Sequence, residues 1–221
     1  MAAKNEGSPR ERLLAAADEL FYSEGVHVVG IDRIVERAGV AKASLYSIFG
    51  SKDELVRAYL QEHFKDRQMR VARILAAHDD PRDRILGIFA EMDAALAARE
   101  FRGCRFILAS AEAHPGDASD AVADEYRAWL RSVFTDQAKA AGAVDPKMAG
   151  RQLTLLYDGA AVAARMDGDR GGAASAMVSA VEALLDAATP AKRDRRKRSW
   201  RLVAERDCRR RRRSSYRPTQ R

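Results

Sequence analysis

The sequence is poor in the residues that build disulfide-held or metal-held folds. Its 221 residues include only two cysteines, Cys104 and Cys208, which lie far apart and form no CxxC pair. The four histidines show no regular ligand spacing. These patterns indicate neither a disulfide framework nor a zinc site. We therefore expect a reduced protein that needs no metal or other cofactor.

Long apolar runs are also missing. No stretch is long enough to span a bilayer, and the first residues, Met1 to Lys4, are not followed by the apolar core of a signal peptide. The sequence thus predicts no membrane partner and a cytoplasmic, nucleoid-associated location.

The alternating pattern of a half-buried strand occurs nowhere, whereas apolar residues recur at helical spacing along most of the chain. With 47% hydrophobic residues the chain can bury a sizeable core. We predict an all-α fold. The expected helices cover about 10–24, 31–38, 42–49, 52–78, a segment through Ile85 to Leu96, a segment through Cys104 to Ala111, a segment through Val122 to about Ala141, 147–166 and 173–188.

Positive charge is concentrated at one end of the sequence. Residues 191–221 hold 15 Lys and Arg against 3 Asp and Glu, a net +12, so residues 1–190 carry about −5 of the total +7. A block of like charge favours disorder and can add nonspecific affinity for phosphates. The basic tail could equally have no role. Nucleic-acid binding by the body of the protein must therefore rest on a motif rather than on its composition.

The stretch from Ile31 to Lys52 has the layout of a helix-turn-helix. Two short helices flank a turn at Ala38-Gly39-Val40, and their apolar residues lie where crossed helices face each other. A long helix follows, with Ser51 and Glu54 in capping-box positions, as Ser8 and Glu11 are before the first helix. Gly30 precedes the second helix and offers no side-chain cap.

This region resembles the tetracycline-repressor (TetR) family of transcriptional regulators. The similarity is specific between Ile34 and Leu55, where the residues AGVAKASLYSIFGSKDEL are similar to the DNA-binding signature of that family, and it extends over about 10–60. The resemblance implies a three-helix DNA-binding domain at 10–55 after a flexible arm at 1–9. It also implies a helical effector-binding and dimerisation domain at 56–189, ahead of a basic disordered tail at 190–221.

The same resemblance suggests which residues contact a double-stranded DNA operator. The second helix of the motif would enter the major groove, and the start of the long helix would meet a phosphate. The candidate DNA-binding residues are Lys42, Ala43, Ser44, Tyr46, Ser47, Ile48 and Lys52.

Three positions depart from the pattern of the family. Gly30 replaces a Ser or Thr cap, Val35 replaces a small residue at the helix crossing, and Ile48 replaces a residue that is often His or Tyr. The last change predicts fewer polar contacts to DNA, with Ile48 suited to a thymine methyl group.

The region beyond residue 60 supplies the expected effector site and dimer contact. The last two helices carry small residues such as Gly159 to Ala164, which allow close helix contacts, either within the subunit or with a second copy. The resemblance favours a homodimer through these helices. Aromatic and methionine side chains of the middle helices could line an apolar pocket for a small-molecule effector, or simply form core: Phe89, Met92, Phe106, Tyr126, Trp129 and Tyr157.

We thus predict a ligand-responsive DNA-binding regulator that acts as a repressor and has no catalytic residues. One alternative is an all-helical enzyme or small-molecule-binding protein without a DNA role, although Glu112 and His114 are the only acid–base pair that suggests itself. Another is a protein that compacts nucleic acid through its basic tail alone. Cys104 is interpreted as a buried structural thiol, since redox sensing needs an exposed thiolate.

Overall fold

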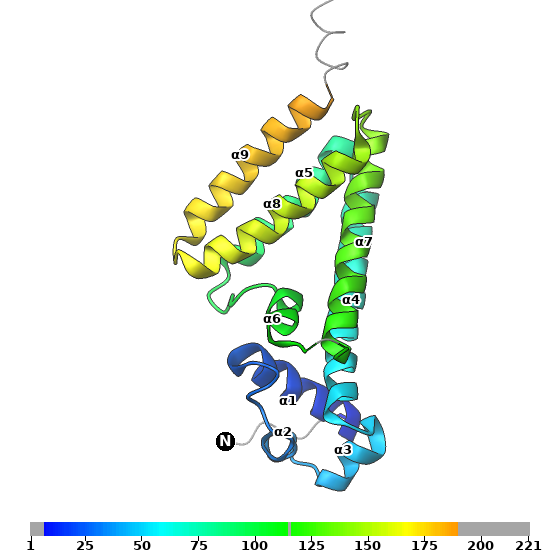
Figure 1. Ribbon diagram of the computed structural model, residues 1–221, viewed down its shortest axis with the longest axis vertical. Coiled ribbons are helices and arrows are strands. Elements are labelled where there is room, and N and C mark those ends of the chain that lie inside the picture. Colours follow the sequence, from blue (N-terminus) through cyan, green and yellow to red (C-terminus); the bar gives the residue numbers. More distant parts are fainter. Residues whose placement is uncertain (1–6, 115, 190–221) are drawn as a thin grey trace, which may run out of the picture.

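The computed structural model describes residues 7–114 and 116–189, and these residues form nine α-helices and no strand (Figure 1). The predicted all-α fold is confirmed. Most of the arm predicted at 1–9 and the tail at 190–221 lie outside the described residues. The helices are α1 (Pro9–Glu24), α2 (Ile31–Ala38), α3 (Lys42–Phe49), α4 (Lys52–Ala77), α5 (Pro81–Ala97), α6 (Arg105–Glu112), α7 (Ala118–Ala140), α8 (Pro146–Met166) and α9 (Arg170–Ala188).

The first helix starts where its sequence predicts. The Ser8 hydroxyl accepts the backbone N–H of Glu11, and the Glu11 carboxylate accepts the backbone N–H of Ser8 at 2.7 Å. This capping box satisfies two N–H groups that the helix leaves unpaired. Pro9 begins the helix, and Gly25 ends it with φ 103°.

Helices α1, α2 and α3 form a small three-helix module. Leu13 from α1, Ile34 from α2 and Leu45 from α3 are fully buried. One large apolar side chain from each helix therefore fixes the crossing of the three. Val35, which replaces a smaller residue in the family pattern, is accommodated in this core at 8% exposure.

Helix α4 runs out of this module into the second half of the molecule (Figure 1). The Ser51 hydroxyl caps it by accepting the Glu54 N–H at 3.1 Å. Near its start Tyr59 packs edge-on against Phe21 of α1, and further along Phe64 packs against Tyr126 of α7. One continuous helix thus contributes to the cores of both halves.

The second half consists of α5, α7, α8 and α9 with the short α6 beneath them (Figure 1). Its core contains Phe89, Phe134, Leu130 and Leu153, each exposed by 1% or less. Helices α7 and α8 approach closely at Gly150, where an added Cβ would lie 3.0 Å from the backbone of Thr135. Gly159 has open space around it, so it takes no part in this internal contact.

The predicted helix ends agree with the structure except near α9. Helices α2 and α3 have the predicted bounds, and α8 begins one residue early at Pro146. Residues 170–172 were expected to be loop because of Gly171 and Gly172, and this was wrong. The Asp169 carboxylate accepts the Gly172 N–H at 2.8 Å, and this cap lets the glycines form the first turn of α9.

Within 7–114 and 116–189, none of the helices combines the length and the apolar character needed to cross a bilayer.

Replacing Leu45 by Ala should lower the free energy of unfolding by about 2–5 kcal/mol, because it leaves a cavity at a fully buried site. Ile48→Ala is the matched control on the same helix. Its side chain is 37% exposed, so we expect a loss of less than about 1 kcal/mol. Urea unfolding monitored by circular dichroism measures both. Equal losses would show that α3 is not anchored through Leu45.

Candidate nucleic-acid interface and its connection to the helical domain

The turn between α2 and α3 is fixed by one glycine. Gly39 adopts the left-handed conformation, with φ 61° and ψ 42°, and its N–H donates to the carbonyl of Glu36 at 3.1 Å. This conformation is sterically unfavourable for residues other than glycine, because their Cβ crowds the backbone. The Arg12 guanidinium donates to the Gly39 carbonyl at 3.2 Å, which ties the turn to α1.

The outer face of α3 carries most of the predicted contact residues. Lys42, Ala43, Tyr46, Ser47 and Ile48 are exposed, with Tyr46 exposed by 46%. Ser44 is half-buried, and so is Lys52 at the start of α4. The structure therefore brings the candidates to one end of the molecule, next to the α3 label in Figure 1.

Lys42 is paired with a carboxylate of the preceding helix. Its Nζ lies 2.7 Å from Oδ1 of Asp32, and this hydrogen bond and charge raise the pKa of the lysine. Both side chains are well exposed, so solvent screens the pair. A phosphate or a base must compete with Asp32 for the ammonium group.

Lys52 points toward the loop between α1 and α2. Its Nζ donates to the backbone carbonyl of His27 at 3.4 Å. Burial lowers the pKa of Lys52, and the charges of Asp53 and Glu112 partly offset this. The lysine thus joins the start of α4 to the α1–α2 loop, a contact that the sequence did not predict.

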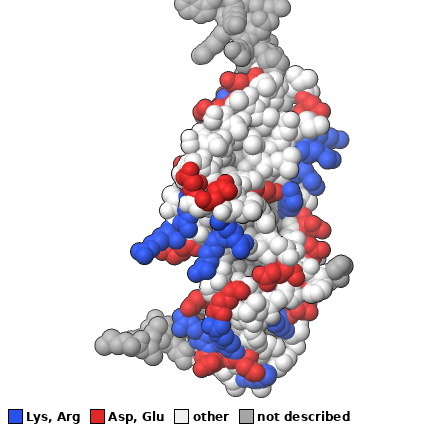
Figure 2. All heavy atoms as spheres, turned by 60° about the vertical axis from the view of Figure 1, so that its left-hand side comes forward, with Lys and Arg blue, Asp and Glu red and all other residues white. Residues whose placement is uncertain are grey.

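Other basic residues of the module are compensated in the same way. Arg33 pairs with Glu24, and Arg37 donates through Nε to Glu19 at 2.9 Å. Figure 2 shows Lys and Arg next to Asp and Glu over the lower part of the molecule, where this module lies. On the face shown, the described part of this module therefore presents mixed charge rather than a broad positive surface.

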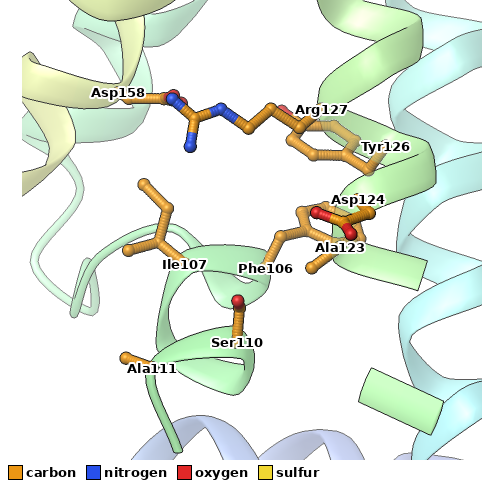
Figure 3. A pocket seen from close by; sticks show the side chains of 9 residues that line it. All are labelled: Phe106, Ile107, Ser110, Ala111, Ala123, Asp124, Tyr126, Arg127 and Asp158. Carbon is orange, nitrogen blue, oxygen red and sulfur yellow. The ribbon is translucent and has the colours of Figure 1, made fainter. Parts of the chain in front are cut away.

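A cavity of about 270 Å³ lies between α6, α7 and α8 (Figure 3). Phe106 of α6 and Tyr126 of α7 stack in its wall with ring centroids 3.8 Å apart. Its lining residues are Phe106, Ile107, Ser110, Ala111, Ala123, Asp124, Tyr126, Arg127 and Asp158.

The charged groups of this cavity come from α7 and α8. Arg127 reaches across toward Asp158, and its Nη2 lies 2.9 Å from Oδ2 of that carboxylate (Figure 3). Burial raises the pKa of Asp158, and the charge of Arg127 opposes this rise. Asp124 of α7 adds a second acidic group to the lining of this cavity.

A second cavity of about 160 Å³ lies between α4, α5 and the start of α6. Arg67 of α4 is buried beside it and pairs with Glu91 and with the hydroxyl of Tyr157. Desolvation would lower the pKa of this guanidinium, but the neighbouring Tyr157, Tyr126 and Glu91 raise it. Burial also raises the pKa of the Cys104 thiol, although the residue as a whole is half-buried rather than buried and lines this cavity.

The six predicted pocket residues occupy two kinds of position. Phe106 and Tyr126 line both cavities, and Met92 and Tyr157 line the smaller one. Phe89 instead stacks on Phe134 at 5.3 Å, and Trp129 packs edge-on against Phe64 at 5.4 Å. These last two line neither of the two cavities described.

Comparison with known proteins agrees with this geometry. Residues 13–59 match the model of the bacterial regulatory proteins of the tetR family. The crystal structure of SCO4454, a TetR-family transcriptional regulator from Streptomyces coelicolor, is similar with a TM-score of 0.77 at 31% identity, over 82% of this chain and 96% of that one. The chain belongs to the TetR family.

Two further relatives support membership in the TetR family. A putative tetR transcriptional regulator from Streptomyces avermitilis is 36% identical with a TM-score of 0.71, over 82% of this chain and 98% of that one. The transcriptional activator FasR from Mycolicibacterium smegmatis is 43% identical over 76 residues, which are 34% of this chain and 35% of FasR. The match thus spans about a third of the length of that curated relative.

In this TetR-family chain the start of α6 is bonded to α1. Tyr22 of α1 donates its hydroxyl to the Gly103 carbonyl at 3.2 Å and accepts the Arg102 N–H at 2.8 Å. The Arg105 guanidinium lies 3.8 Å above the Tyr22 ring and pairs with Asp18. Residues just before and within α6 therefore hold the N-terminal module directly.

The end of α6 is fastened to the α1–α2 loop. Glu112 accepts the backbone N–H of His27 at 3.0 Å. Gly25 leaves room for this carboxylate, because an added Cβ would lie 2.7 Å from its Oε1. Glu112 therefore has a structural partner, which removes the basis for interpreting it as half of an acid–base pair.

Sequence reasoning missed the polar groups of the cavities. Arg67 falls between Phe64 and Val71 on the apolar stripe of α4. A charged residue on an apolar helix face is seldom buried without a partner, so this position could have indicated a buried polar site. Arg127 and Asp158 lie on different helices, so the spacing of residues along the sequence could not predict that they pair.

Asp18→Asn should weaken the junction between α1 and α6. Burial alone would raise the pKa of Asp18, but its hydrogen bond with His63 and the charges of His63 and Arg105 lower it. A carboxyl with a lowered pKa stabilises the fold above its unfolded pKa of about 3.9, and this stability is lost as pH falls through the folded value. Because Asp18 is 42% exposed, we expect a loss of about 1 kcal/mol or less at pH 7.

The difference between the wild type and Asp18→Asn should shrink below about pH 4, where the wild-type carboxylate also becomes protonated. Thermal melts from pH 3 to pH 7 measure it. Asp66→Asn, at an exposed site in the middle of α4, is the control. A pH-independent difference would assign the effect to packing rather than to charge.

Proposed function

We propose that this protein is a sequence-specific transcriptional repressor that binds a palindromic DNA operator as a homodimer and is released by a small molecule. The outward face of α3 carries this proposal, because it presents Tyr46, Ser47 and Ile48 on a helix whose opposite side is anchored by Leu45. Residues 10–55 would read the operator, and residues 56–189 would bind the effector and dimerise.

Lys42, Ala43 and Ser44 lie in the first turn of α3, the end that enters the major groove in helix-turn-helix proteins. Tyr46 and Ser47 offer hydroxyl groups, and Ile48 an apolar surface for a thymine methyl. Lys52 would bind a phosphate at the N-terminus of α4 by giving up its hydrogen bond to the His27 carbonyl.

The homodimer is supported by an exposed apolar stripe on α8. Leu155, Val162 and Met166 are exposed by 63%, 39% and 78%, and helical spacing places them with Gly159 along one side of the helix. Val178 of α9 is exposed by 36%. Apolar rows of this kind with a bare glycine between them suit a close contact with a second copy of the same helices.

The effector would occupy the cavity between α6, α7 and α8. Its stacked aromatic rings suit a flat apolar group, while Asp124, Asp158 and Arg127 fix polar substituents. Helix α6 lines this cavity and is bonded to α1 and to the α1–α2 loop, so a shift of α6 would reach the DNA-reading module. The continuous helix α4 is a second connection. The free energy by which the effector weakens operator binding then equals the difference in its binding free energy for the two conformations. Such coupling free energies are typically about 1–3 kcal/mol.

The sign of regulation needs its own measurement, because the relative FasR is an activator. In a reporter strain, a repressor lowers transcription from a promoter that contains the operator, and an activator raises it. We propose repression because a dimer bound to a promoter can block transcription without any further contact.

Selection of bound DNA from a random pool should yield a near-palindrome whose half-sites lie about one helical turn, roughly 34–36 Å, apart. On that DNA the double variant Tyr46→Ala/Lys52→Ala should bind at least about tenfold more weakly, since it removes two polar contacts of about 1 kcal/mol or more each. Fluorescence anisotropy at a fixed salt concentration measures the change.

Met69→Ala is the control for this double variant, because Met69 is exposed on α4 far from α3. Unchanged affinity in the double variant would contradict the assigned interface. A pool without any enriched sequence would instead favour the alternative of a small-molecule-binding protein without a DNA role.

Leu155→Glu should convert the homodimer to a monomer, because it buries a charge in the proposed contact without disturbing the core of the protomer. Analytical ultracentrifugation measures the mass, and anisotropy should show operator affinity falling with dimerisation. Met69→Glu introduces the same charge at a site that is 54% exposed and should remain dimeric. A dimer that survives Leu155→Glu would place the interface elsewhere.

A further inference from the structure

Two histidines and an aspartate meet at the junction of the two halves of the molecule. His27 belongs to the α1–α2 loop, His114 follows α6, and Asp117 precedes α7. Their ligand atoms all lie within 4.8 Å of one another. In the part of the chain that the structure describes, no other group of three or more such residues lies this close.

The spacing of these atoms is too long for direct hydrogen bonds. Oδ2 of Asp117 lies 3.8 Å from Nε2 of His27 and 3.7 Å from Nδ1 of His114. Hydrogen bonds between such groups are about 2.7–3.2 Å long. The two imidazole rings lie edge to face with centroids 5.3 Å apart. The three ligand atoms thus lie close together, but this carboxylate oxygen is not hydrogen-bonded to either ring nitrogen.

These separations are close to those of a metal polyhedron. Zinc binds histidine nitrogen and carboxylate oxygen at about 2.0–2.2 Å in tetrahedral geometry, which puts neighbouring ligand atoms roughly 3.3–3.5 Å apart. The two measured separations exceed this by only a few tenths of an ångström. Neutral imidazoles with one carboxylate form a ligand set typical of zinc sites that keep a fourth position for water.

The surrounding contacts hold two of the three ligands in place. The Asp117 carboxylate accepts the backbone N–H of His114 at 2.7 Å, which orients it toward the cluster. The backbone of His27 is bonded through its N–H to Glu112 and through its carbonyl to Lys52. The His114 side chain is 79% exposed, so its ring is free to turn toward an ion.

We propose that His27, His114 and Asp117 form a binding site for a divalent transition-metal ion of the zinc class, which ties the α1–α2 loop to the connection between α6 and α7. Such an ion links the N-terminal module to the helix that lines the larger cavity. It adds a bond across the junction through which a shift of α6 reaches the N-terminal module, and so influences the position of α3. Local spacing does not indicate this site, because 87 positions separate His27 from His114.

Titration of the full chain with zinc chloride tests the site without DNA. Isothermal titration calorimetry should show one ion per chain. His27→Gln and His114→Gln should each weaken binding at least about tenfold, because loss of even an outer-shell partner costs about 10–100-fold. His78→Gln is the matched control, as His78 lies at the far end of α4.

Cobalt(II) gives a second readout for the same variants, because its visible absorption reports nitrogen and oxygen ligation directly. Saturable binding that is lost in both histidine variants and retained in His78→Gln supports the site. Absence of binding, or equal binding by all four proteins, overturns it. Loss in only one of the two variants overturns the ligand set.

The effect on DNA is measured separately, with the operator obtained by selection. Saturating zinc should change operator affinity about fivefold or more in the wild type and leave it unchanged in His27→Gln. Unchanged affinity in the wild type overturns the coupling between the metal and α3. Because the calorimetry needs no operator, failure of the metal site and failure of the proposed DNA function are distinguishable.

Discussion

The contacts between α1 and the segment around α6 hold the two halves of this protein in register. Tyr22 and Asp18 bind the start of α6, and Glu112 at its end binds the α1–α2 loop. These bonds are mostly partly exposed hydrogen bonds and ion pairs, so each contributes only a modest net free energy. An interface made of several weak polar bonds can be rearranged by a ligand more readily than a packed apolar core, which resists small shifts.

The charge distribution of the N-terminal module complements this picture. Lys42, Arg33 and Arg37 each face a carboxylate of the same module. The contribution of these three cations to DNA affinity by counterion release is therefore limited, because each must leave its carboxylate before it meets a phosphate. Discrimination between sequences then depends on the shape and the few polar groups of α3. This arrangement suits a protein that must dissociate in response to a signal.

The sequence predicted the parts of the structure that depend on local chemistry. The capping box at Ser8, the side-chain cap of Ser51 and the glycine turn at Gly39 all follow from spacing of a few residues. The bounds of α2 and α3 were predicted correctly for the same reason. The first turn of α9 was missed because a cap from Asp169 outweighs the low helix propensity of two glycines. The candidate DNA-binding residues share one surface for the same local reason.

The cavities and the junction could not be predicted in this way. Arg127 meets Asp158, Glu112 meets His27, and His27 meets Asp117 only because distant helices pack against each other. The residues around one short helix, α6, contact the N-terminal module at both ends of the helix, while its middle lines a cavity. Since Lys52 is bonded to the same loop as Glu112, any displacement of that loop also changes the start of α4. The His27 loop is thus a structural connection between the cavity of the second half and the N-terminal module, in addition to the continuous helix α4.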